Sequence, residues 1–423
     1  MRFMSLAIIA AMFASCKPAS AGPSKKVVNA VKPTLESVIK PNQPKEVRAM
    51  WLSFPFWDMT NAKKELFARY IASQGVNKVF LSVYDSGIAR WNSAVLTQNG
   101  IATTTGDLPL IFAVNLFRKY GIEVSAFFEG GLSVFLERDF VKQHQELLQR
   151  CPNGTVSGEH GGHLYSFLDP SSPQVQSIII SALEELARHS VGFQEIQLDR
   201  FRYTHFDWKF CTAADGTSNP QYVNNIVQQS YRRIKTVNPS ALVTAAPVGS
   251  YGYWKHNQSW GEWVAGGYID GIESQAYIPH QPLTECARGT AQTKGRKITL
   301  AVFKGELASL TGQPRLLETS LSELNSLGAN ANKIMEVEYR RPMVLAREKE
   351  LAAAKKPFRL SIGFYAQDFD DSECVQEQMK LARELGYKNS VLWVSQVAPS
   401  NAGEPNPAID DNLSLLRSTF WKD

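Results

Sequence analysis

The feature that most constrains the fold is a pattern that recurs from residue 47 onward. A short β-branched or aromatic run precedes a polar loop and an amphipathic helix, and several of these helices end at glycine. The pattern predicts strands over residues 47–54, 78–84, 123–129, 195–199, 241–247, 269–278, 358–365 and 390–395. Because strands that alternate with helices pair in parallel, eight such units predict a (β/α)8 barrel, the TIM barrel of α/β proteins.

Helix boundaries support this repeat. Helices predicted over residues 61–74 and 109–120 are followed by Gly75 and Gly121, which suit the left-handed position after a helix. Ser172 and Pro173 have the residue types of an N-cap and a first helical position, and a further helix is predicted over residues 222–236.

A ninth strand-like run, residues 298–303, competes for the seventh strand of the barrel. We assign residues 358–365 to that strand, which leaves residues 282–356 as an elaboration between strands six and seven of a single domain. An open doubly wound sheet is the alternative architecture, but no Gly-x-Gly-x-x-Gly turn follows the first strand.

The N-terminus has the pattern of an export signal. Residues 1–21 contain Arg2, an apolar run and the small-residue site Ala19-Ser20-Ala21, as in a secretory signal peptide. In a competing interpretation, Phe13-Ala14-Ser15-Cys16 is a bacterial lipobox and Cys16 is lipidated. Residues 22–45, rich in Pro and Lys, predict a tether, and the barrel occupies residues 46–423. We therefore expect an exported protein of the bacterial periplasm or cell envelope. It would be attached to a membrane only if Cys16 is lipidated, and through that lipid alone.

The charge and the cysteine content indicate which ligands and cofactors the protein is expected to lack. The 45 basic and 40 acidic residues give a net charge of +5 without an arginine-rich run, which argues against nucleic acid. Cys151, Cys211, Cys286 and Cys374 match no zinc template, although they could pair in three ways in an oxidising compartment. The loop predicted around His160 and His163 lacks a clearly placed further ligand. We expect neither a metal nor another cofactor, and the sequence does not indicate the oligomeric state.

The chemistry of a TIM barrel lies at the carboxyl ends of its strands. There the sequence places carboxylates, amides and an aromatic side chain: Asp85, Glu129, Asp199, Gln275, Tyr277, Asp368 and Gln396. Trp51 and Trp393 lie within the first and last strands, where they either pack inside the barrel or stack on a sugar. Two acids, aromatic rings and amides are what a glycoside-cleaving site requires, so the sequence predicts a glycan substrate.

The sequence feature that points most clearly to a functional site follows the predicted fourth strand. There Asp199 precedes Arg200, Phe201, Arg202 and Tyr203. An acid at a strand end can act as nucleophile or base, and either arginine could keep it ionised by lowering its pKa. The alternative is a structural Asp-Arg ion pair at the rim of the barrel. Arg200, Arg202, Tyr203 and Asp85 are therefore candidate substrate-binding residues beside Asp199.

Several stretches in order resemble the bacterial glycosyl-hydrolase-like family 10. They are Arg48-Ala49-Met50-Trp51-Leu52, Leu168-Asp169-Pro170 with Pro173 and Val175, Ile196 to Asp199 with Tyr203, Gln275-Ala276-Tyr277-Ile278-Pro279, and Ile362-Gly363-Phe364-Tyr365. The resemblance covers roughly residues 46 to 400. It implies a glycosidase like the family's envelope lipoproteins, which hydrolyse denuded peptidoglycan strands, with Asp199 as a catalytic or substrate-binding carboxylate.

Two positions depart from the family pattern. Ala49 stands where the family has Gly, and Arg200 stands where many members have a second acid. We assign the proton donor to Glu129, whose pKa an apolar collar including Phe127 could raise, with Asp368 and Glu273 as rivals. Gln275 and Tyr277 would orient the sugar. The competing hypotheses are a non-catalytic glycan-binding envelope protein on the same barrel and a hydrolase of another polysaccharide.

Overall fold

The structure is a computed structural model. It describes residues 46–151, 153–160, 163–203, 219–247, 258–275, 297–302, 315–320, 350, 353–356, 358–365, 379, 382–383, 386–394 and 413–421. All of these residues belong to one compact unit, Glu46–Asp423. The predicted signal peptide, tether and lipidation site at Cys16 lie outside the described residues.

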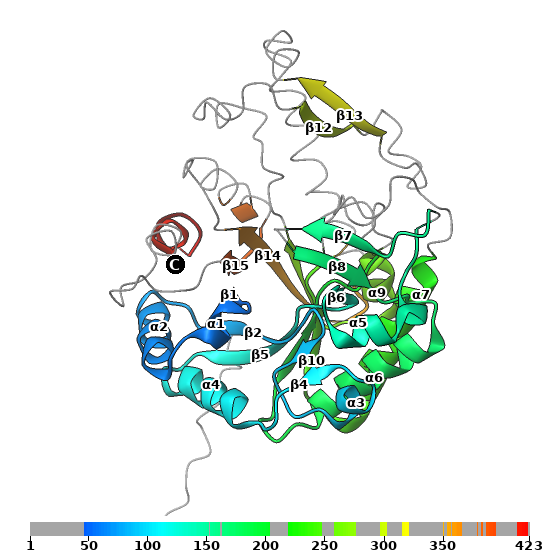
Figure 1. Ribbon diagram of the computed structural model, residues 1–423. Helices are drawn as coiled ribbons and strands as arrows, with labels where there is room; N and C mark the ends of the chain where they lie inside the picture. The colour runs from blue at the N-terminus through cyan, green and yellow to red at the C-terminus, as the bar shows by residue number, and fades with distance from the viewer. Residues whose placement is uncertain are drawn as a thin grey trace, which may run out of the picture. The chain divides into compact units, whose positions relative to one another are not determined.

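Eight parallel strands form a closed barrel with helices around it (Figure 1). In order around the barrel they are β1 (Arg48–Leu52), β2 (Lys78–Asp85), β5 (Glu123–Phe128), β9 (Glu195–Leu198), β10 (Leu242–Ala245), β11 (Gly271–Gln275), β14 (Arg359–Tyr365) and β15 (Asn389–Val394). Strand β1 pairs with both β15 and β2, which closes the ring. The predicted TIM barrel is confirmed, and each predicted barrel strand overlaps an observed one.

Four of the five principal helices overlap helices that the sequence predicts, and the last of the five was not predicted. They are α2 (Asn61–Ser73), α4 (Leu108–Lys119), α6 (Pro173–Ala187), α7 (Pro220–Val237) and α9 (Trp260–Gly266). The side chain of Ser172 accepts a hydrogen bond from the Val175 amide, so the predicted N-cap is confirmed. Gly75 and Gly121, which follow α2 and α4, have φ of +91° and +72°, as a left-handed helix end requires.

The remaining elements lie between these units. They are α1 (Pro55–Asp58), β3 (Ile88–Ala89), α3 (Ala94–Gln98), β4 (Ala102–Thr103), β6 (Ser133–Phe135), α5 (Asp139–Gln143), a 3-10 turn (Gln145–Leu147), β7 (Ser157–His160), β8 (His163–Phe167), β12 (Lys297–Val302), β13 (Arg315–Ser320) and a π-helical turn (Leu416–Phe420). Strand β12 pairs antiparallel with β13 in a separate two-stranded sheet, so the assignment of the seventh barrel strand to β14 is confirmed.

One local prediction was wrong. The segment around His160 and His163 is not a loop, because β7 and β8 pair antiparallel there and His160 lies opposite His163. Within the described residues, no group of three or more His, Cys, Asp or Glu side chains is arranged to hold a metal ion.

Aromatic side chains fill the barrel interior. The Trp51 ring lies 6.2 Å from Phe80 and 6.3 Å from Phe127, centroid to centroid, and is fully buried. A Cβ atom on Gly363 would lie 2.4 Å from the Trp51 ring, so glycine on β14 makes room for the indole. The assignment of Trp51 to substrate binding is therefore corrected: Trp51 packs inside the barrel and offers no face to a sugar.

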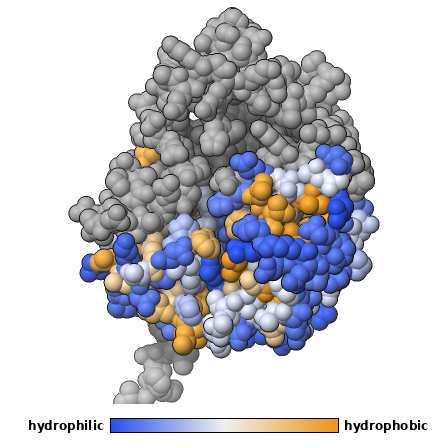
Figure 2. All heavy atoms as spheres, in the orientation of Figure 1, coloured by the Kyte–Doolittle hydropathy of each residue, from blue (hydrophilic) through white to orange (hydrophobic). Residues whose placement is uncertain are grey.

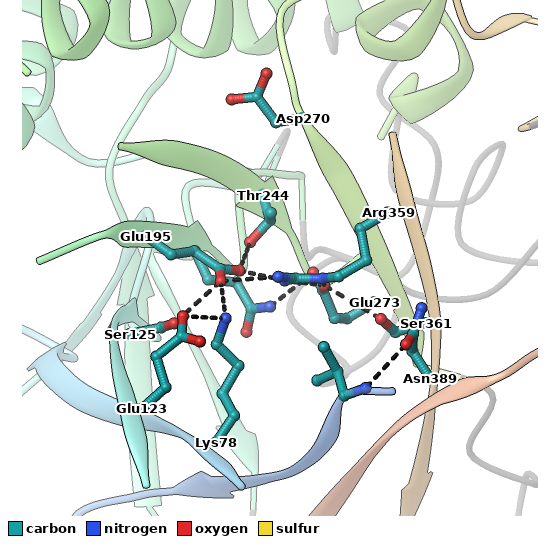
Figure 3. Close-up of polar contacts among 12 residues, drawn as sticks. Lys78, Glu123, Ser125, Glu195, Thr244, Asp270, Glu273, Arg359, Ser361 and Asn389 are labelled. Atoms are coloured by element: carbon teal, nitrogen blue, oxygen red, sulfur yellow. Dashed lines mark hydrogen bonds and ion pairs between the residues drawn. The ribbon is translucent and has the colours of Figure 1, made fainter. Parts of the chain in front are cut away.

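A buried ionic network crosses the amino-terminal end of the barrel (Figure 3). Glu195, the first residue of β9, pairs with Lys78, the first of β2, and with Arg359, the first of β14. Arg359 also pairs with Glu273 of β11, and hydroxyls of Ser125 and Thr244 donate to Glu195. Polar groups at this end of a TIM barrel serve stability, because the chemistry takes place at the other end.

On the face that Figure 2 shows, hydrophilic side chains cover much of the described surface on the right of the view, and hydrophobic patches lie among and beside them. In the part of the chain that the structure describes, no helix is long and apolar enough to cross a membrane.

Candidate functional site

Three neighbouring strands bring three carboxyl groups to the carboxyl end of the barrel. Asp85 ends β2, Glu129 follows β5 directly, and Asp199 follows β9 directly, and β5 pairs with both other strands. Backbone hydrogen bonds continue past these ends, from Gly130 to Tyr84 and from Asp199 to Phe128. The sequence prediction that these acids share one edge of the sheet is confirmed.

Glu129 lies in a protected environment. Its side chain is 2% exposed, and the Ser53 hydroxyl lies 2.9 Å and 3.0 Å from its two carboxyl oxygens. Burial and the charge of Asp85 raise the pKa of Glu129 to about 8, against the opposing charge of Arg200 and hydrogen bonds from Ser82 and Ser53. A carboxyl group with this pKa carries its proton at neutral pH, as a general acid must.

Asp199 has different partners. It accepts hydrogen bonds from the backbone N–H of Arg200 at 2.7 Å and from Nε2 of Gln275 at 3.1 Å. The expectation that arginine charge gives Asp199 a lowered pKa was wrong: burial raises the pKa above its usual range, although Arg202 and Arg200 both oppose this. Two N–H donors and two arginine charges favour the ionised form, which a nucleophile or base requires.

Arg200 turns back toward the other acids. Its φ of +56° is in the left-handed region, and its Nη1 lies 3.9 Å from Oδ1 of Asp85 and 3.5 Å from the Ser133 hydroxyl. Burial works to lower the pKa of Arg200, but Glu129, Asp85 and Asp199 raise it above its usual value, so the guanidinium stays charged. The structure therefore places a cation among three carboxyl groups.

Two glycines after Glu129 make this arrangement fit, and sequence reasoning missed them. A Cβ on Gly130 would lie 2.3 Å from the Ser86 backbone nitrogen, and one on Gly131 would lie 2.1 Å from the Asp199 carbonyl oxygen. Gly131 also has a φ of +53°. A Gly-Gly pair directly after a strand-ending acid was the available signal, since it indicates close approach of backbones.

The other predicted site residues divide into three groups. Arg202 and Tyr203 are buried, and the Tyr203 hydroxyl donates to the Asn219 carbonyl at 3.3 Å. Trp393 is half-buried and packs with Val47 against the cluster around Trp51. Tyr277, Asp368 and Gln396 lie outside the described residues.

Glu273, the rival proton donor, belongs to the amino-terminal network. It is fully buried, and Arg359 and Nε2 of Gln197 both donate to its carboxyl oxygens. Burial raises its pKa, against the charge of Arg359. These contacts tie Glu273 to the amino-terminal end of the barrel, so of these two candidate proton donors only Glu129 lies on the same end of the barrel as Asp199.

Cys151 is disulfide-bonded. Cys211, Cys286 and Cys374 lie outside the described residues.

Several solved structures that this chain resembles are described as glycosidases. An endo-β-1,4-mannanase from Thermotoga petrophila matches with a TM-score of 0.50 at 8% identity, over 89% of this chain and 77% of the mannanase. A putative α-L-fucosidase from Bacteroides thetaiotaomicron matches with a TM-score of 0.49 at 10% identity, over 94% of this chain and 100% of the other. For an α-galactosidase from Thermus thermophilus the TM-score is 0.46 at 12% identity, and the match covers 88% of this chain but 65% of the galactosidase, under two thirds of its length. At these identities the mannanase likeness shows the TIM-barrel fold alone.

Sequence comparison identifies the family. No curated protein matches the chain. The family model described as glycosyl hydrolase-like 10 matches residues 46–303, which begin where the described barrel begins. Since this match spans more than half of the 423 residues, the chain belongs to the glycosyl hydrolase-like 10 family.

Proposed function

We propose that this protein is an exported glycoside hydrolase that acts on cell-envelope glycan, foremost the glycan strands of peptidoglycan. The observation that carries the proposal is the pair of buried acids on adjacent strands, Glu129 and Asp199, in different electrostatic surroundings. Hydrolysis of a glycosidic bond requires one carboxyl group that gives a proton and one carboxylate that attacks the sugar or activates water.

In the proposed mechanism Glu129 donates its proton to the glycosidic oxygen as the bond from the anomeric carbon to that oxygen breaks. Asp199 acts on the other side of the sugar, either as the nucleophile or as the base for water. Gln275, whose amide bonds to Asp199, keeps that carboxylate in position. The cation of Arg200 favours the carboxylate that Glu129 becomes after proton transfer, because opposite charges attract strongly in a buried site.

Export is part of the proposal. The signal-like N-terminus supports it, and so does the disulfide at Cys151, because disulfides persist outside the cytoplasm. Lipidation of Cys16 would hold the enzyme at a membrane facing the envelope glycan. No metal or other cofactor enters the proposed mechanism.

The test uses protein without residues 1–21 and its Asp199→Asn and Glu129→Gln variants, each incubated with intact and with peptide-stripped peptidoglycan. Mass spectrometry should detect soluble sugar fragments from the parent and from a Glu184→Gln control on the outer helix α6, but not from Asp199→Asn. Greater release from stripped strands would identify these as the preferred substrate.

A non-catalytic glycan-binding protein is the second candidate. Arg200 favours it, because this chain has a cation where many family members have a second acid. Under this alternative no variant and no parent protein releases sugar, while all of them sediment with the stripped glycan.

A further inference from the structure

Two arginines lie beside the candidate active site and take no part in the proposed mechanism. Arg90 follows the β2–β3 hairpin and Arg138 precedes α5, so both stand on connections at the carboxyl end of the barrel. The charges of Asp85 and Arg138 both act on Arg90, which places the two arginines near each other and near the acid that ends β2.

Aromatic rings hold both guanidinium groups. The Arg90 guanidinium lies 4.7 Å from the centroid of Phe54, and the Arg138 guanidinium lies 5.2 Å from that of Phe135. The Arg138 side chain also rests on the β2–β3 turn, because a Cβ on Gly87 would lie 3.6 Å from its Cγ. Stacking on rings restricts a guanidinium plane and leaves its edge for hydrogen bonds.

These edges lack protein acceptors. Nη2 of Arg90 and Nε of Arg138 are buried and make no hydrogen bond. Among the described residues neither arginine has an ion pair within 4.0 Å, and Asp58 and Asp85 act on Arg90 only from a longer distance. Two neighbouring cations with buried, unused donors are unfavourable unless an anion binds between them.

We propose that Arg90 and Arg138 form a subsite for a carboxylate carried by the glycan substrate. The inference rests on the proposed function and adds substrate selection to it. A carboxylate matches the planar donor edge of a guanidinium. In peptide-stripped peptidoglycan each muramic acid residue carries a free carboxylate, whereas in an intact strand a peptide amide occupies that carboxyl group. The subsite therefore selects strands from which the peptide has been removed.

The test compares two substrates that differ only at the carboxyl group of muramic acid: peptide-stripped strands, and the same strands with these carboxylates converted to neutral methylamides. For the parent protein we expect KM to be about tenfold lower on the free acid, the effect of one charge-assisted hydrogen-bonded contact. Arg90→Gln and Arg138→Gln should each raise KM on the free acid by about that factor and leave KM on the methylamide and kcat on both unchanged.

Two control variants separate binding from folding. Arg233→Gln, on the exposed side of α7, should keep the parent's preference. Arg90→Lys, which retains the positive charge but lacks the planar donor edge of a guanidinium, should keep part of the preference for the free acid. Equal KM values for the parent on both substrates would overturn the subsite, and so would equal losses on both substrates in Arg90→Gln and Arg138→Gln.

Failure of the proposed function gives a different result. If the parent cleaves neither substrate, calorimetric titration with the same two glycans still tests the subsite. Tighter binding of the free acid that Arg138→Gln abolishes would support the subsite in a binding protein, while equal affinities would overturn it.

Discussion

At the scale of single residues, Glu129 and Asp199 are both buried acids with raised pKa values, but different donors surround them. Glu129 receives hydrogen bonds from the hydroxyls of Ser53 and Ser82, whereas Asp199 receives two N–H groups and the field of two arginines. Since the N–H donors and arginine charges around Asp199 act against its burial and favour the ionised form, we assign the proton to Glu129 and the carboxylate role to Asp199.

The pH dependence of catalysis follows from this difference. We expect kcat/KM to fall above about pH 8, where Glu129 loses its proton, and at acidic pH, where Asp199 gains one. Ser53→Ala removes a hydrogen bond that lowers the pKa of Glu129, so the alkaline limb should move to higher pH. Initial rates over a pH series measure the profiles of the parent and of Ser53→Ala. An alkaline limb in Ser53→Ala at the same pH as in the parent, or at a lower pH, would contradict the role of Glu129.

Stability should depend on the same group. The pKa of Glu129 is about 8 in the folded protein, against a usual 4.5. Between these two pH values the folded protein keeps the proton on Glu129 and the unfolded protein loses it. The free energy of unfolding therefore decreases as pH rises from 4.5 to 8. Glu129→Gln removes the effect. At pH 8 the variant should be more stable than the parent by on the order of a few kcal/mol. Urea unfolding at pH 5 and pH 8 checks this, and a difference independent of pH would contradict it.

At the scale of elements, the turn after β5 decides where the acids lie. Gly130 and Gly131 bring the end of β5 against β2 and β9, with no space for a Cβ at either glycine. The hydrophobic pattern predicted the strands, but this contact depends on the paths of three backbones. Only the Gly-Gly pair in the sequence reflects it.

Gly131→Ala should therefore reduce activity through Asp199. A Cβ there would meet the Asp199 carbonyl oxygen, so the turn must shift, at a cost of about 1–3 kcal/mol in stability and about 100-fold in kcat/KM. Gly106→Ala is the matched control, because nothing lies within 4 Å of its added Cβ and its φ is not positive. Comparable kinetics for the two variants would show that the turn does not position Asp199.

The ionic network at the amino-terminal end of the barrel joins the strands β2, β9, β11 and β14 and contributes to stability. Arg359→Met would leave Glu195 and Glu273 buried without their shared cation, and we expect a loss of about 3–5 kcal/mol in unfolding free energy. Arg188→Met, on the exposed end of α6, should change it by less than about 0.5 kcal/mol. Denaturant titration of both variants is the measurement, and similar midpoints would contradict a structural role for the network.

At the scale of the whole molecule, the barrel could be predicted because each of its units repeats the same local signals. The positions of Asp85, Glu129 and Asp199 followed from topology, since parallel strands end at one edge. The role of Trp51 could not be predicted, because its burial depends on Gly363, which lies more than three hundred residues further along the chain. Likewise, the sign of the pKa shift of Asp199 depends on whether burial outweighs two arginine charges, and spacing alone does not give burial.

The measurement that tests the central claim most directly compares leaving groups. Glu129→Gln and Asp199→Asn are assayed on stripped glycan strands and on an aryl glycoside of the same sugar whose dinitrophenolate leaves without protonation. If Glu129 is the proton donor, Glu129→Gln loses about 100-fold or more on the glycan but retains bond cleavage on the aryl glycoside, while Asp199→Asn loses both. Equal losses of Glu129→Gln on both substrates, or full activity of Asp199→Asn on either, would contradict the assigned roles.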